Sequence, residues 1–112
     1  MNLNQQQKTY LAQWANSYKQ DLEENILPFW LKYGLDTVNG GVYTCVNRDG
    51  SLMDTTKSVW FQGRFGFICA FAYNNIAQKE EWLAASKSCV EFIEKHMAEY
   101  DGVYVFRPAD GE

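Results

Sequence analysis

One ten-residue stretch occurs twice in this chain of 112 residues. Residues 41–50 read GVYTCVNRDG and residues 102–111 read GVYVFRPADG, with five identical positions and an offset of 61 residues at both ends. The segments that follow the first copy have helical periodicity. The repeating unit is therefore a short hairpin followed by two helices. Such units are typical of folds that bury apolar surface by stacking one unit on the next.

Two of the predicted helices lie between the copies, and they differ in character. Residues 57–77 are apolar on nearly all sides, which places this helix inside a structure, with Thr55 or Thr56 as its cap. Residues 80–98 carry one apolar stripe and one charged side, which is typical of an outer helix. The sequence therefore predicts a pair made of one inner and one outer helix.

A third helix precedes the first hairpin. Residues 5–33 place apolar side chains at steps of three and four, so one aromatic-rich face requires other helices for cover. Pro28 lacks a backbone N–H and predicts a kink or break near residues 25–27.

The hairpins complete a prediction of fold class. The first covers residues 41–54, with a turn at Asp49 and Gly50. The second, at 102–112, stops at its turn, so we expect a truncated chain whose last strand lacks its partner. The whole of 1–112 is predicted to be the N-terminal part of one domain, all-α with short β-hairpins.

Composition and charge argue against several classes of function and location. The net charge is −4 and the ten basic residues are scattered, which argues against nucleic-acid binding. No apolar run approaches the length of a membrane span, and the polar first residues do not form a signal peptide. The three cysteines have no metal-type spacing, which predicts buried thiols and a cytoplasmic location.

Three motifs, in the right order, resemble the N-acylglucosamine 2-epimerase (renin-binding protein) family. They are ILPFW at 26–30, NGGVY at 39–43 and KSVWFQGR at 57–64. The resemblance implies an (α/α)6 barrel, in which inner and outer helices alternate around a central pocket, with only the first few helices present here. It also implies interconversion of N-acetylglucosamine and N-acetylmannosamine by proton transfer at C2 of the open-chain sugar.

The resemblance implies site residues as well. Arg64 matches the arginine of the family's Gln-Gly-Arg motif and is expected to orient the sugar and stabilise its oxyanion, with a structural ion pair as the alternative. Trp60, Tyr43 and Tyr104 are expected to offer aromatic surface to the sugar, and core packing is the alternative for each. Lys57 and Gln62 are candidates for supporting groups, and a solvated lysine is the simpler reading.

The expected site residues do not include the general acid and general base of the reaction. His96 is the only histidine, and it lies on the predicted outer helix, away from a pocket. No position matches the family's two catalytic histidines, so we expect the chain to be inactive alone. The resemblance implies no metal or required cofactor, and it allows a nucleotide effector such as ATP and a homodimer.

Other functions stay open. The same scaffold serves mannose isomerases and cellobiose 2-epimerases, and (α/α)6 barrels also occur among glycoside hydrolases that use paired carboxylates. A non-enzymatic interaction module, or an inactive fragment whose aromatic faces bind a partner, is the remaining alternative.

Overall fold

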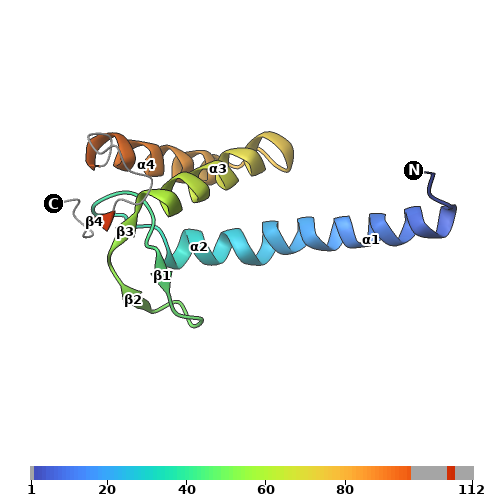
Figure 1. Cartoon of the computed structure of the whole chain (residues 1–112), viewed down its shortest axis with the longest axis horizontal. Coiled ribbons are helices and arrows are strands. Elements are labelled where there is room, and N and C mark those ends of the chain that lie inside the picture. The colour runs from blue at the N-terminus through green and yellow to red at the C-terminus, as the bar shows by residue number, and fades with distance from the viewer. Residues whose placement is uncertain (1, 97–105, 108–112) are drawn as a thin grey trace.

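The computed structural model describes residues 2–96 and 106–107. A long helical rod lies along one side, and two helices packed side by side lie above its carboxyl-terminal part (Figure 1). Small strands gather where the rod ends and the helix pair begins. The chain is therefore mainly helical with short antiparallel strand pairs, as the sequence predicts.

The rod consists of α1 (Gln5–Asp21), a π-helical turn (Leu22–Ile26) and α2 (Leu27–Tyr33). At its start Asn4 and Gln7 form a reciprocal capping box. Pro28 follows the wide turn, in which the Leu27 N–H bonds back five residues to the Leu22 carbonyl. The predicted irregularity is present, but it is a π-turn and not a break, because the wider ring accommodates the proline.

The first hairpin is shorter than the predicted 41–54. Its strands are β1 (Cys45–Val46) and β2 (Leu52–Asp54), antiparallel with Cys45 opposite Asp54. Gly50 closes the turn at a φ of 95°, which a glycine adopts without strain. Val42, inside the predicted hairpin, lies outside both strands and forms an isolated bridge with Leu35.

The region before the inner helix differs from the prediction. Lys57–Ser58 forms a strand, β3, and the helix α3 runs from Val59 to Asn75 in place of 57–77. Ser58, not Thr55 or Thr56, caps it, since the Ser58 Oγ accepts a hydrogen bond of 3.1 Å from the Phe61 N–H.

The second hairpin was expected to leave its first strand unpaired, and this is wrong for the residues that the structure describes. β4 (Phe106–Arg107) pairs with β3 in antiparallel register, with Lys57 opposite Arg107. The strand that precedes the inner helix therefore supplies the missing backbone partner. The rest of 102–112 lies outside the described residues.

The core lies between α3 and α4 (Glu80–His96). The prediction of 80–98 for the outer helix agrees with this span over the described residues. On α3 the buried residues are Gln62, Phe65, Gly66, Cys69 and Ala72. On α4 they are Trp82, Ala85, Ser86, Cys89 and Phe92. Of the rod, Leu27 is buried in this core and Leu22, Trp30 and Leu31 pack against it partly buried, whereas α1 has no buried residue.

Candidate functional site

A buried ion pair joins the loop after the rod to the start of the inner helix. Lys57 is fully buried, and its Nζ lies 2.6 Å from Asp36 Oδ2 and donates to the Gly40 carbonyl at 2.7 Å. The reading of Lys57 as a solvated lysine is therefore wrong. The loop folds over the ammonium group and satisfies it with a carboxylate and a carbonyl.

Asp36 is held by more than the lysine. Its Oδ1 accepts hydrogen bonds from the backbone N–H groups of Val38 and Asn39, each at 3.0 Å. Burial alone would raise the pKa of Asp36, but Lys57 and these N–H donors outweigh it and lower the pKa to about 2. The carboxylate is therefore a fixed anion and not a candidate for proton transfer near neutral pH.

Tyr43 is partly buried beside this ion pair. Its ring centroid lies 5.1 Å from Lys57 Nζ. Burial and the neighbouring Asp36 carboxylate raise the pKa of Tyr43 above its ordinary value. The contacts favour the packing interpretation over the sugar contact, which stays a prediction.

Gln62 links the loop to α3 by a two-point clamp. Its Oε1 accepts from the Val42 N–H at 2.8 Å, and its Nε2 donates to the Val42 carbonyl at 2.6 Å. Gly41, at a φ of 75°, makes this possible, because a Cβ there would lie 2.6 Å from the Gln62 Oε1. The Gly41 N–H donates to the Ser88 Oγ at 2.9 Å and ties the loop to α4.

Arg64 and Trp60 lie on the opposite, exposed face of α3. The Arg64 guanidinium stands over the Trp60 ring, 4.6 Å from its centroid, and Trp60 is 53% exposed. Arg64 is exposed, so the aromatic rings of α3 do not enclose its guanidinium. Its large neighbours on the same face are also exposed: Phe67, Ile68 and Phe71.

A groove of about 210 Å³ borders Arg64. It lies between the rod and α3, and its walls are almost wholly apolar. The lining residues are Ile26, Leu27, Trp30, Phe61, Arg64, Phe65 and Ile68. The guanidinium is the one charged group among them, so a polar ligand held here would meet a single fixed cation beside aromatic surface.

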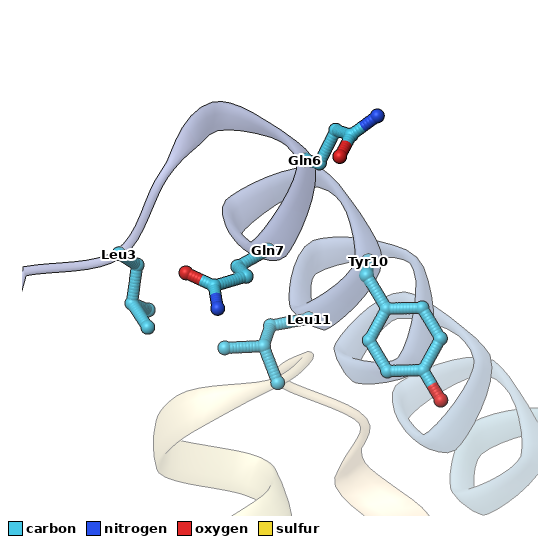
Figure 2. Close-up of a pocket in the computed structure, with 5 residues that line it drawn as sticks. All are labelled: Leu3, Gln6, Gln7, Tyr10 and Leu11. Atoms are coloured by element: carbon cyan, nitrogen blue, oxygen red, sulfur yellow. The ribbon is translucent and has the colours of Figure 1, made fainter.

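A second groove, of about 480 Å³, lies at the beginning of α1 (Figure 2). Leu3 and Leu11 point toward one another there, while Gln6 and Tyr10 point away. It contains neither a cation nor a carboxylate among its lining residues, and it is unsuited to stabilise a developing charge.

The remaining candidates lie apart from Arg64. His96 ends α4, where its ring packs on Phe92 at 4.7 Å between centroids. Tyr104 lies outside the described residues. Cys69 and Cys89 are buried, and burial raises the pKa of each thiol to about 12. Within residues 2–96 and 106–107, no three His, Cys, Asp or Glu side chains are grouped to hold a metal ion.

Sequence reasoning missed the roles of Asp36, Lys57 and Gln62. The signal was available in part, because Lys57 and Gln62 both belong to KSVWFQGR and bond to the backbone of Gly40 and Val42 in NGGVY. Asp36 lies three residues before NGGVY, and no motif marked it.

Known proteins resemble both the sequence and the fold. No family model matches the sequence. N-acylglucosamine 2-epimerase from Rattus norvegicus is 31% identical over 91 residues, 80% of this chain and 22% of the relative. A sugar epimerase from a ruminal bacterium superposes with a TM-score of 0.73 at 30% identity, covering 87% of this chain and 25% of its own. Cellobiose 2-epimerase from Bacillus thermoamylovorans B4167 gives 0.77 at 28% identity, covering 90% and 26%.

These matches define the fold and the family. The chain spans between a fifth and about a quarter of each protein's length. Its fold is a part of an (α/α)6 barrel, and the placing of α3 as an inner and α4 as an outer helix stays a prediction. In the part of the chain that the structure describes, no helix has the length and apolar character to cross a membrane. The chain belongs to the N-acylglucosamine 2-epimerase family.

Proposed function

We propose that this chain forms the arginine-bearing part of the pocket of a sugar 2-epimerase that interconverts N-acetylglucosamine and N-acetylmannosamine. The observation that carries the proposal is the exposed face of α3, where Arg64 stands over Trp60 beside an apolar groove. The similarity to N-acylglucosamine 2-epimerase supports the choice of sugar.

The proposed role of Arg64 follows from the chemistry of C2 inversion. Removing the C2 proton of an open-chain sugar places negative charge on the C1 oxygen. A guanidinium presents several N–H donors in a fixed plane and keeps its charge at all relevant pH values. Donors already aimed at such an oxyanion typically contribute about 10²–10³ in rate. The exposed ring of Trp60 offers a flat surface to the apolar face of the sugar.

The proton-transferring groups of this proposal lie outside the 112 residues. His96 packs on Phe92 at the end of the outer helix, and Asp36 is held as an anion by Lys57. Neither is placed to take a proton from a sugar that contacts Arg64. We therefore propose that the chain is inactive by itself. An adenine-nucleotide effector, a homodimer and a cytoplasmic location belong to the same proposal.

A second candidate substrate is cellobiose. It is favoured by the similarity to the Bacillus thermoamylovorans cellobiose 2-epimerase, at 28% identity over 90% of this chain. The two substrates share the C2 chemistry and the need for a cation near C1. They differ in the group at C2, acetamido or hydroxyl, so they can be compared in one assay.

A chimera tests the proposal. The aligned 91 residues of the Rattus norvegicus enzyme are replaced by this chain's own. Entry of deuterium at C2 of N-acetylmannosamine in heavy water is then followed by NMR, with cellobiose as the second substrate. We expect exchange by the chimera and a loss of about 10²-fold or more in its Arg64→Met form.

The matched control is Arg48→Met, because Arg48 is exposed in the hairpin turn away from α3. It should exchange like the parent chimera. A folded Arg64→Met chimera with unchanged exchange would remove Arg64 from the mechanism, and exchange by residues 1–112 alone would refute their inactivity.

A further inference from the structure

The inner helix α3 has little apolar preference for one rotation about its own axis. Its buried face carries Phe65, Cys69 and Ala72, and its exposed face carries Phe67 and Phe71. A helix with large apolar groups on both sides gains similar burial in several rotational settings. Apolar packing therefore cannot by itself determine where the side chains of α3 point.

Polar contacts can determine it, and Gln62 makes the most specific one. Its side chain is fully buried, and its amide satisfies both backbone groups of Val42. Turning α3 would break both bonds together and leave three or four buried polar groups without partners. Ser86 makes a second tie one turn further on, where its Oγ donates to the Gly66 carbonyl at 2.8 Å.

The clamp also sets the direction of Arg64. Two residues along an α-helix correspond to a rotation of about 200°, so Gln62 and Arg64 point to nearly opposite sides. With Gln62 fixed on Val42, the guanidinium is directed onto the exposed face beside Trp60.

We propose that Gln62 is a positioning residue, whose clamp on the Val42 backbone fixes the rotation of α3 and thereby aims Arg64. The importance of that aim for catalysis rests on the proposed function. The rotation itself involves only contacts within the described residues and is tested without any sugar.

The first test replaces Gln62 by methionine, which has a similar length and no hydrogen-bonding amide. Cys69 on α3 and Cys89 on α4 are both fully buried and report on rotation. Labelling by dithiodipyridine is resolved by peptide mass spectrometry. We expect Gln62→Met to raise the labelling rate of Cys69 relative to Cys89 by about tenfold, because the penalty for other settings of α3 is lost.

Chemical modification of arginine reports directly on the direction in which the Arg64 side chain points. Phenylglyoxal reacts with exposed guanidinium groups, and Arg48 in the hairpin turn provides an internal reference. We expect the ratio of Arg64 to Arg48 modification to fall in Gln62→Met. Asn74→Met, an exposed change on the same helix, should alter neither ratio. Trp82→Leu, which weakens the core away from the clamp, should raise both thiol rates by a common factor.

Gln62→Glu keeps the proposal falsifiable if the methionine variant does not fold. A protonated glutamic acid has one donor and one acceptor and can reproduce the clamp, and burial raises its pKa so that it is protonated at about pH 5. At about pH 5 we expect the Cys69-to-Cys89 labelling ratio and the Arg64-to-Arg48 modification ratio to equal those of the unchanged chain. At about pH 8 the carboxylate cannot donate, so we expect the Cys69-to-Cys89 ratio to be raised. Asp36 and Lys57 are present both in Gln62→Glu and in the unchanged chain. Comparing these two proteins at each pH therefore cancels any effect of that pair.

Two results would overturn the proposal. One is an equal change at Cys69 and Cys89 in Gln62→Met, as in Trp82→Leu, which would mean that Gln62 contributes only stability. The other is no change in either ratio. If the thiol and arginine ratios change as expected while the Arg64→Met chimera exchanges normally, the positioning is upheld and the proposed function fails.

Discussion

Removing the buried ammonium group of Lys57 should be among the most damaging single changes in this chain. In Lys57→Met the aliphatic stem is retained, but the Asp36 carboxylate and the Gly40 carbonyl lose a donor at 2.6 and 2.7 Å. Breaking one side of a buried ion pair leaves an uncompensated charge and typically costs about 3–5 kcal/mol. We expect a loss of that size in the free energy of unfolding at neutral pH.

The same variant should change the pH dependence of stability. In the unchanged chain the pKa of Asp36 is about 2 when folded, against an ordinary value of 3.8 for an aspartic acid. The carboxylate therefore stabilises the fold above pH 3.8, and this contribution, about 2 kcal/mol, is lost as the pH falls through the folded pKa. Without Lys57 the folded pKa rises, so the loss of stability on acidification should be smaller.

Urea unfolding followed by circular dichroism, at several pH values from neutral to acid, measures both effects. The matched control is Lys87→Met, which removes an exposed lysine whose Nζ lies 3.7 Å from Glu91 and should cost no more than about 0.5 kcal/mol. The double variant Asp36→Asn/Lys57→Met should recover part of the loss, because no lone buried charge remains. Equal unfolding midpoints for Lys57→Met and Lys87→Met would refute the buried pair.

Two further comparisons test the fold by the same unfolding measurement. Gly41→Ala should cost about 1–3 kcal/mol, because its φ is positive and a Cβ would meet the Gln62 amide, whereas Gly63→Ala, with no atom within 4 Å of its Cβ, should gain up to about 1 kcal/mol. A loss of stability in both glycine variants would contradict the different surroundings of the two glycines. Trp82→Ala should cost about 3–5 kcal/mol since the ring is buried in the core, and Trp14→Ala on the exposed rod about 0.5 kcal/mol or less. Similar losses for both would mean that α1 is packed in solution.

Much of the fold could be predicted from hydrophobic periodicity. The stripe on residues 80–98 and the all-round apolar character of residues 57–77 indicated two helices, and α4 and α3 confirm them, while their outer and inner places stay a prediction. Turn chemistry located the hairpin, since Gly50 has the positive φ that the Asp-Gly pair predicts. Boundaries were less accurate, because Lys57–Ser58 pairs with Phe106–Arg107, a contact that no local pattern reveals.

The site was predicted less well, for a physical reason. Arg64 and Trp60 are expected site residues from the resemblance alone, and their exposure depends on which face α3 turns outward. An apolar helix has no local sequence pattern that indicates this face. Lys57 was misread because a lysine is usually solvated. Its burial depends on the Asp36 carboxylate, 21 positions earlier in the chain, so only the folded structure brings the pair together.

The central claim is that the exposed face of α3 contacts sugar, and NMR of the tryptophan indole N–H signals tests it most directly. On titration of the chain with N-acetylmannosamine, the Trp60 signal should shift in a saturable way. The buried Trp82 and the distant Trp14 should not respond, and Arg64→Met should weaken the response of Trp60. A Trp60 signal that does not move, or that moves no more than that of Trp14, would contradict the account.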